Sequence, residues 1–206
     1  MRKLVGALFV AMMFAVVPSQ AQVMDQLHWS VNAGLNVSNY LNTPSIVDAK
    51  AKAGAFFGVG LEYRIDPSWY LESGLNISLK GSSVKGAWGG DTSNIAKVKF
   101  NPIYLHIPLH VGYKLRFDNG YNLNLSAGPY LAYGLGGKGK IGGEKESIFS
   151  SNGWDFKRFD AGLGVKAGMD IDIFNVFLGY DYGLVKMQND FKAKNGNFYA
   201  GVGLKF

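Results

Sequence analysis

The chain has no cysteine among its 206 residues. This absence excludes disulfide bonds and also a lipid anchor attached through a lipobox cysteine. Charged residues make up 17% of the chain, below the roughly 25% that is usual in soluble domains. Beyond residue 21, no stretch approaches the roughly 20 apolar residues that a transmembrane helix needs. A membrane-spanning form of this chain would therefore have to be a closed β-barrel, held in place by its own fold.

The N-terminal residues have the pattern of a secretory signal peptide. Arg2 and Lys3 form a basic start, a short apolar run follows, and Ser19–Ala21 supplies the small residues of a cleavage site. We therefore predict a signal peptide at residues 1–21 and one mature domain at residues 22–206. Cleavage would remove two of the 21 cationic residues and leave 19 against 15 acids, a net charge of +4. This excess is too small to indicate a nucleic-acid partner.

The clearest pattern that is present lies at the C-terminus. From Phe198 to Phe206, every second residue is apolar, and the residues between are aromatic, small or basic. Successive side chains of a strand point to opposite faces, so the chain ends in a strand with one apolar face and a terminal aromatic residue. Transmembrane β-barrels of Gram-negative outer membranes end in this way.

Similar alternation recurs along the mature chain. The predicted strands are Leu27–Ser38, Ala53–Ile65, Trp69–Lys80, Ile103–Arg116, Tyr121–Gly134, Phe159–Asp170, Val176–Leu184 and Phe198–Phe206. Short turns at Asp66–Ser68, Asp118–Gly120 and Asp172–Phe174 alternate with long loops at Asn39–Lys52, Gly81–Lys97, Leu135–Lys157 and Lys186–Gly196. The pattern predicts an all-β fold, an eight-stranded antiparallel up-and-down transmembrane β-barrel with both termini on the short-turn side, which in such barrels is the periplasm.

A soluble antiparallel barrel would show the same period with its apolar face buried. Aromatic residues near the predicted strand ends favour the membrane form, because they resemble two interfacial girdles. The short-turn girdle would hold Trp29, Tyr63, Trp69, Tyr113, Phe117, Tyr121 and Phe174, and the long-loop girdle Tyr40, Trp88, Tyr133 and Phe159. The alternative, that these aromatics pack a core, stays open at this point.

The other face of each strand would line a lumen only wide enough for side chains. We expect a lumen charge network of Glu62, Arg64, Glu72, Lys114, Arg116, Asp160, Lys166 and Asp181, with Lys80, Asp170 and Lys205 on the same face. Glu62 and Glu72 should lie opposite each other across a short turn, with Arg64, Lys114 or Lys166 supplying a cation between them. This arrangement is consistent with a gate or a proton-sensitive plug, and also with a salt-bridged core.

Chemistry within the lumen has little support from the sequence. His106 and His110 are four residues apart on one strand, about 13 Å, which is too far to share a metal ion. An enzyme could recruit Ser126, a histidine and Asp160, but no Gly-x-Ser-x-Gly motif occurs. We therefore predict no metal, no cofactor and no catalytic residue.

The long loops carry more of the positive charge. We consider Lys138, Lys140, Lys145, Lys192 and Lys194 as contacts for lipopolysaccharide phosphates, with ordinary solubilising charge as the alternative. The glycine-rich stretch Gly134–Gly143 is predicted to be a mobile loop.

Several motifs resemble the PorT-like outer-membrane β-barrel domain family. They are Tyr104–Leu109, Gly128–Gly134, Phe159–Gly164 and the terminal Phe206. The resemblance implies an integral outer-membrane protein, inserted by the barrel assembly machinery through recognition of the final strand. It carries no catalytic residue across, and a role in protein secretion like that of PorT is one of its implications.

The leading functional hypothesis is a non-enzymatic envelope or surface-interaction protein like the small OmpA and OmpX barrels. Its expected partners are outer-membrane lipid and lipopolysaccharide, the assembly machinery and a surface protein, and we expect a monomer that binds no nucleic acid. A narrow gated channel or a secretion-associated barrel is the alternative. A lipid enzyme at the loop rim is a third hypothesis.

Overall fold

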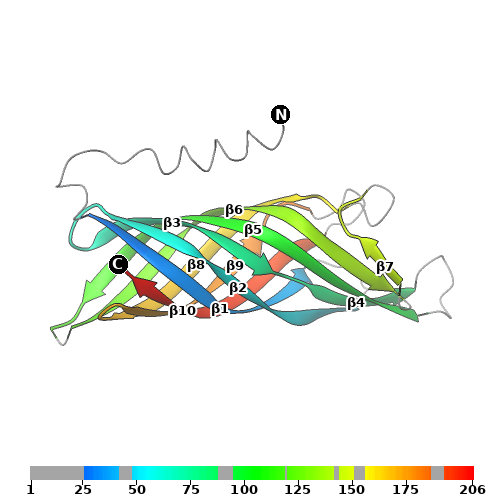
Figure 1. The fold of residues 1–206 in the computed structure, drawn as a ribbon, viewed down its shortest axis with the longest axis horizontal. Coiled ribbons are helices and arrows are strands. Elements are labelled where there is room, and N and C mark those ends of the chain that lie inside the picture. The colour runs from blue at the N-terminus through cyan, green and yellow to red at the C-terminus, as the bar shows by residue number, and fades with distance from the viewer. Residues whose placement is uncertain are drawn as a thin grey trace.

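The computed structural model describes residues 26–41, 48–87, 95–118, 120–141, 144–150, 156–186 and 193–206. The predicted signal peptide at residues 1–21 lies outside the described residues. Ten strands form one antiparallel sheet (Figure 1). They are β1 (Leu27–Leu41), β2 (Asp48–Arg64), β3 (Trp69–Leu79), β4 (Ser82–Ala87), β5 (Ile95–Arg116), β6 (Tyr121–Ile141), β7 (Glu144–Ser147), β8 (Phe159–Ile171), β9 (Phe174–Gly183) and β10 (Lys194–Lys205).

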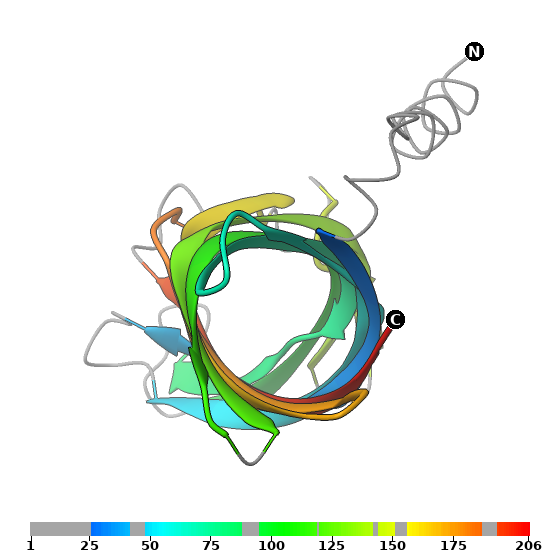
Figure 2. The same ribbon diagram turned by 90° about the vertical axis from the view of Figure 1, so that its left-hand side faces the viewer.

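Eight of these strands form the wall of a closed antiparallel barrel. Pairing runs from β1 through β2, β3, β5, β6, β8 and β9 to β10, and β10 pairs with β1 to close the ring. Figure 2 shows the ring from the short-turn end. The predicted fold class is therefore confirmed. None of the described residues forms a helix that is long and apolar enough to span a membrane.

The two remaining strands lengthen the wall at the long-loop end, on the right in Figure 1. β4 follows β3 after Lys80 and Gly81 and lies between β2 and β5, while β7 pairs with the end of β6. β5 begins at Ile95 and β6 continues to Ile141. Gly134–Ile141 is thus strand, and its prediction as a mobile loop is wrong. Its backbone hydrogen bonds with β5 and β7 stabilise a segment whose own alternation is too weak to predict a strand.

The short turns are stabilised by side-chain and backbone hydrogen bonds. Asp66 Oδ1 accepts hydrogen bonds from the backbone N–H groups of Ser68 and Trp69, both at 2.7 Å. Asp172, between β8 and β9, has a φ of 55°, and Gly120, between β5 and β6, has a φ of 83°. Asp and Gly adopt this left-handed conformation at low cost, which allows the strands to reverse within a few residues.

The faces of the wall are inverted relative to a soluble barrel. Leu35 is 71% exposed and Val165 is 56% exposed on the outside, whereas Asn36 and Asp181 are each 1% exposed on the inside. A soluble monomer exposes contiguous apolar patches of only roughly a few hundred Å². A barrel that is apolar around its outer surface is therefore suited to hydrocarbon.

Aromatic side chains occupy both edges of the apolar band. Trp29, Trp69, Tyr113, Phe117, Tyr121 and Phe174 are exposed near the short turns, and Tyr133 and Phe159 are exposed towards the other end. Trp69 and Tyr113 pack edge to face, with ring centroids 5.1 Å apart. Tyr40 was expected in the long-loop girdle, but it is buried inside the barrel. Trp88 lies outside the described residues.

Candidate functional site in the lumen and at the loop end

The lumen contains three groups of polar side chains, one above another. The turn-side cluster consists of Glu62, Lys114, Asp170 and Lys205. Lys114 Nζ lies 2.6 Å from Glu62 Oε1 and 3.5 Å from Asp170 Oδ2. Lys205 Nζ lies 3.1 Å from Glu62 Oε2 and 2.8 Å from Asp170 Oδ2. Two lysines and two carboxylates thus form a closed square of ion pairs across the lumen.

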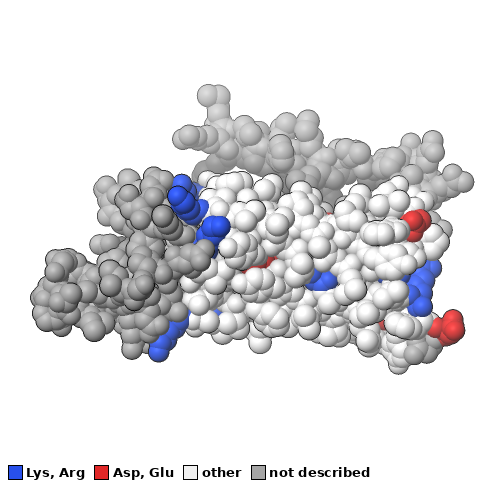
Figure 3. Space-filling model, turned by 180° about the vertical axis from the view of Figure 1, so that it is seen from behind, with Lys and Arg blue, Asp and Glu red and all other residues white. Residues whose placement is uncertain are grey.

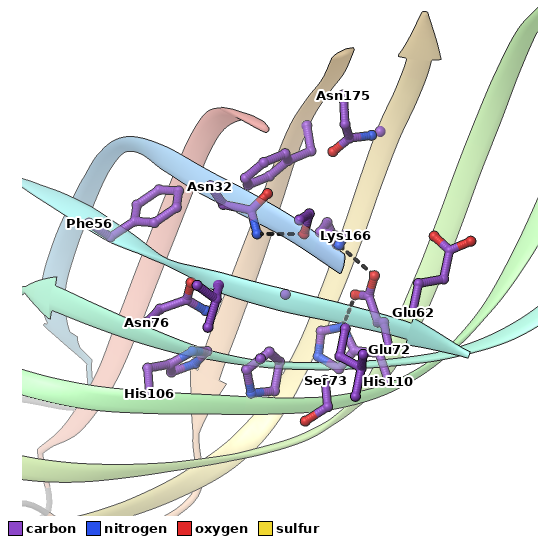
Figure 4. A pocket seen from close by; sticks show the side chains of 18 of the residues that line it. Asn32, Phe56, Glu62, Glu72, Ser73, Asn76, His106, His110, Lys166 and Asn175 are labelled. Carbon is purple, nitrogen blue, oxygen red and sulfur yellow. Dashed lines mark hydrogen bonds and ion pairs between the residues drawn. The ribbon is translucent and has the colours of Figure 1, made fainter. Parts of the chain in front are cut away.

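The central cluster is built around Glu72. Lys166 Nζ lies 2.5 Å from Glu72 Oε2, and His110 Nδ1 lies 3.1 Å from Oε1 (Figure 4). The hydroxyl of Ser126 donates to the same Oε1 at 2.9 Å. A catalytic serine would donate to the histidine. Here Ser126 Oγ lies 3.5 Å from His110 Nδ1, the same ring nitrogen that faces Glu72, whereas a catalytic histidine uses different ring nitrogens for the serine and the carboxylate.

Glu62 and Glu72 are directly paired across β2 and β3, as the short turn between them predicts. Each carboxylate has its own lysine: Lys114 for Glu62 and Lys166 for Glu72. Arg64 was the third candidate cation. Its guanidinium lies 3.2 Å from His28 Nε2 at the short-turn end, so the structure does not place it between the two carboxylates.

The loop-side cluster contains Asp160 and Asp181. Asn195 donates to Asp160 Oδ2 at 2.8 Å, and Asn197 donates to Asp181 Oδ2 at 3.3 Å. His106 Nε2 lies 3.3 Å from Asp181 Oδ2, within ion-pair distance but poorly aligned for a hydrogen bond. The Asn residues of β10 were not predicted to take part, although they fall on its inward face.

Lys80 completes the charged groups at this level. Its ammonium group lies 5.6 Å from the ring centre of Tyr104 and 5.4 Å from that of Tyr130. The hydroxyl of Tyr130 lies 3.4 Å from Asp160 Oδ2. The aromatic rings therefore take the place of a carboxylate as the close neighbours of this cation.

A cavity of about 100 Å³ lies beside the three clusters. Its lining extends from His28 at the short-turn end to Lys80 and Asn197 near the loop end. Asp181 Oδ1, Asn197 Oδ1 and Asn124 Oδ1 line it without a hydrogen-bond partner in the described protein. At roughly 10–15 Å³ of accessible space for each water, the cavity has room for several waters to satisfy these oxygens.

Two glycines leave an open space between His110 of the central cluster and Asp181 of the loop-side cluster. Gly164 and Gly128 lie in register between Asp181 and His110 on the lumen face. A Cβ atom on Gly164 would lie 2.9 Å from both Asp181 Oδ1 and His110 Nε2. These two polar atoms therefore face one small space, which a side chain at position 164 would fill.

Apolar side chains gather at the loop end of the lumen. Phe100 and Phe156 have ring centroids 5.1 Å apart, and Tyr40 packs at 6.1 and 6.2 Å from them. Ile148 is 0% exposed, and Phe149 packs edge to face on Tyr104. We call Tyr40, Phe100, Ile148, Phe149 and Phe156 the aromatic plug. Three of them belong to a segment that was predicted to be loop, so the pattern of alternation could not identify the plug.

No group of three or more His, Asp or Glu side chains in the described part of the chain could hold a metal ion. His106 and His110 face different carboxylates, Asp181 and Glu72. The remaining predicted lumen residue, Arg116, is exposed at the end of β5. No ion pair between Arg116 and the clusters is present among the described residues.

The terminal residue, Phe206, extends the seam of the barrel. Its N–H donates to the carbonyl of Trp29 at 2.8 Å, and its carbonyl accepts from the N–H of Trp29 at 3.1 Å. Its side chain is 71% exposed on the outer surface. Phe206 and the first described residues lie at the short-turn end (Figure 1).

The predicted loop lysines occupy different places. Lys138 and Lys140 are exposed on the extended part of β6. Lys145 lies in β7, where its backbone pairs with that of Lys140. Lys194 begins β10, with its ammonium group 5.4 Å from the ring centre of Tyr182. Lys192 lies outside the described residues.

Further lysines join Lys138 and Lys140 at this end. Lys99 of β5 is exposed and directly opposite Lys140, and Lys52 of β2 donates to the side-chain oxygen of Asn101. On the face in Figure 3, Lys and Arg are the charged residues coloured at the loop end, whereas both signs appear at the short-turn end. Lys52 and Lys99 were not predicted as contacts. Lys52 was assigned to the end of the first long loop, and Lys99 precedes Ile103, where the fourth strand was expected to begin.

Comparisons with known proteins agree with this architecture. Residues 19–189 match the family model described as outer membrane protein beta-barrel domain. No curated protein is similar enough to count as a match. The PorT-like designation is not part of the matched description and stays a prediction.

Solved structures with similar folds are outer-membrane and surface proteins. Ail of Yersinia pestis is 16% identical, with a TM-score of 0.45 over 87% of this chain and 98% of that one. OprG of Pseudomonas aeruginosa is 14% identical, with a TM-score of 0.46 over 87% and 95%. Neisserial surface protein A is 17% identical, with a TM-score of 0.44 over 86% and 97%.

Proposed function

Because this chain belongs to the outer membrane protein β-barrel domain family, we propose that it is a closed, non-enzymatic barrel of the outer membrane with an envelope-structural or surface-interaction role. The ion pairs that join facing strands across the lumen are the observation that supports this proposal. A barrel with a closed lumen acts through its outer surface and its loop end.

The ion-pair clusters support a closed lumen. A solute that passed along the barrel would have to separate Lys114 from Glu62 and Lys166 from Glu72, which are in contact at 2.6 and 2.5 Å. Breaking a buried ion pair costs about 3–5 kcal/mol when one charge loses its partner. Above these clusters the solute would also have to displace Phe100 and Phe156 of the aromatic plug.

The strand extension supports a surface role. β2, β4, β5, β6 and β7 pair beyond the end of the apolar band, so their side chains are held on hydrogen-bonded backbone. Such a surface loses less conformational entropy on binding than a flexible loop would. In this proposal the loop end faces outwards and both termini face the periplasm. The chain would be a monomer that the barrel assembly machinery inserts by recognising the strand that ends in Phe206.

Single-channel recording tests the closed lumen. The purified mature protein, reconstituted in planar bilayers, should produce no discrete current steps at moderate voltage. Heat-modifiable migration on a denaturing gel should show in the same sample that the barrel is folded. Discrete steps from folded protein would contradict the proposal.

A narrow gated channel is the second candidate, and the cavity of about 100 Å³ favours it. In that case Phe100→Ala with Phe156→Ala should remove the plug and produce current steps that the wild-type protein lacks. Under the closed-barrel proposal the same variant stays silent, because the turn-side and central clusters still cross the lumen.

A further inference from the structure

The outer surface changes from apolar to basic at one level on two neighbouring strands. On β5 the outward residues Leu105 and Ile103 are followed by Asn101 and Lys99. On β6 the exposed residues Tyr133 and Leu135 are followed, after a register shift between the strands, by exposed Lys138 and Lys140. This change marks the upper edge of the apolar band on this side of the barrel.

Two cross-strand pairs of polar residues make up this region, and three of the four residues are lysines. Asn101 is directly opposite Lys138, and Lys99 is directly opposite Lys140. Opposite residues of an antiparallel pair lie on the same face. Phe100 and Gly139, their neighbours in sequence, are buried, so Lys99 and Lys140 both point outwards.

Lys52 adds a third cation to this face. Its ammonium group donates to the side-chain oxygen of Asn101. We call Lys52, Lys99, Lys138 and Lys140 the lysine ladder.

Among the side chains that the structure describes, no ion pair links the four lysines of the ladder to a carboxylate. Every lysine of the turn-side and central clusters, by contrast, contacts a carboxylate. Directly opposed like charges destabilise a strand pair. An external anion that binds between Lys99 and Lys140 would remove this repulsion.

The depth of the ladder restricts the anion. Asn101 and Lys99 lie two and four residues beyond Ile103, about 7 and 13 Å along the strand. With a strand tilt of roughly 35–45°, these lengths correspond to about 5 and 10 Å along the membrane normal. The polar layer on each side of a bilayer is about 5–8 Å thick. Asn101 therefore lies within the headgroup layer, and Lys99 lies just beyond its outer edge, from where its long, flexible side chain can reach back to the headgroups.

We propose that the lysine ladder binds the phosphate groups of a glycolipid in the outer leaflet, the lipid A part of lipopolysaccharide. Lys99 and Lys140 would hold one phosphate between them, and Lys52 and Lys138 would contact the headgroup below. This inference rests on the proposed surface role. It assigns that surface to a lipid neighbour instead of a soluble partner.

Nanodiscs provide the test, because they supply the lipid sideways to the folded barrel. The full mature protein is placed in phosphatidylcholine nanodiscs with a trace of labelled lipid A, and retention is measured by native mass spectrometry and fluorescence. One lysine near an anionic headgroup contributes about a fivefold change in affinity, so K99Q with K140Q should weaken lipid A binding roughly thirtyfold. Dephosphorylated lipid A should bind the wild-type protein as weakly as phosphorylated lipid A binds the variant.

The matched control removes the same charge elsewhere at the loop end. Lys157 and Lys186 are exposed and lie outside the ladder, so K157Q with K186Q should change lipid A binding by less than a factor of about three by charge screening. Equal losses in both double variants would overturn the inference, since binding would then depend on net charge alone.

Two further outcomes distinguish the sources of phosphate. Inorganic phosphate should fail to displace lipid A, and displacement at low concentration would mean that the ladder is a site for free phosphate. Heat-modifiable migration should show that each variant is folded. Because planar-bilayer current tests only the lumen, a conducting barrel that still binds lipid A would contradict the closed-barrel proposal and leave the ladder intact.

Discussion

The lumen and the loop-end extension carry charge in different ways. In the lumen, Lys114, Lys166 and Lys205 each contact a carboxylate of a neighbouring or facing strand. On the extension, Lys99 is opposite another lysine. The difference follows from the solvent, because a charge enclosed by the barrel has to be neutralised within the protein, whereas a charge at the membrane surface can be neutralised by lipid.

We expect the largest loss of stability where a charged side chain in the lumen loses its ion-pair partner. Glu72→Gln should leave Lys166 without its carboxylate and lower the free energy of unfolding by about 3 kcal/mol. The double variant Glu72→Gln with Lys166→Met should recover most of this loss. Urea unfolding in lipid vesicles measures both, and a double variant no more stable than the single one would contradict the pairing.

A smaller effect is expected where the lumen is crowded without a change of charge. Gly164→Ala places a methyl group 2.9 Å from Asp181 Oδ1 and His110 Nε2, which should cost about 1–3 kcal/mol. Gly136→Ala is the control, because a Cβ atom there has no neighbour within 4 Å. Equal stabilities of the two variants would mean that the lumen relaxes around position 164.

Asp66 in the first short turn is intermediate between the lumen and the loop-end extension. It is exposed, as the lysines of the extension are, but it has hydrogen-bond partners within the protein, as the lumen charges do. Hydrogen bonds from the N–H groups of Trp69 and Ser68 lower the pKa of Asp66. The carboxylate therefore contributes its full stability above the unfolded-state pKa of about 3.9, and the contribution disappears as the pH falls through the lower folded-state value.

Asp66→Ala should accordingly be less stable than the wild-type protein at neutral pH, and the difference should shrink in acid. Asp66→Asn retains an acceptor oxygen without a charge, so its stability relative to Asp66→Ala should not change with pH. Thermal unfolding of the three proteins as a function of pH makes the measurement. A difference between wild type and Asp66→Ala that grows in acid would contradict the assignment.

The smallest predicted effect has the opposite sign and lies on the extension. In neutral lipid, Lys99→Gln should raise the free energy of unfolding by about 0.2–1 kcal/mol, because it removes a like charge opposite Lys140. Lys157 lies outside the strands and is not paired opposite another lysine, so Lys157→Gln should leave the free energy of unfolding unchanged. A loss of stability in Lys99→Gln would mean that the lysine is needed for the fold itself.

The wall strands could be predicted because they alternate strongly between apolar and polar residues. The segment predicted as Trp69–Lys80 is β3, Trp69–Leu79, and the pairing of Glu62 with Glu72 follows from the three-residue turn between their strands. The first part of β5 was missed. Lys97 and Lys99 occupy the alternate positions that are apolar further along β5, so this segment lacks the apolar outer face by which the wall strands were predicted. It is held by pairing with β4 and β6.

The choice of ion-pair partners also depended on tertiary structure. Arg64, Lys114 and Lys166 were equivalent candidates on the predicted face, but only the closure of the ring decided which strand faces which. Lys166 of β8 reaches Glu72 of β3 across the lumen, whereas Arg64 contacts His28 of the adjacent β1. Arg116 has the right alternation, yet its position at the end of β5 places it beyond the clusters.

The order of the amino acids alone gives each wall strand one apolar and one polar side, because successive side chains of a strand point to opposite faces. The folded barrel was needed to show where the strands continue beyond the apolar band, which lysine meets which carboxylate, and that Phe100 packs against Phe156 at the loop end of the lumen. These features depend on contacts between segments distant in sequence, and such contacts exist only once the barrel has closed.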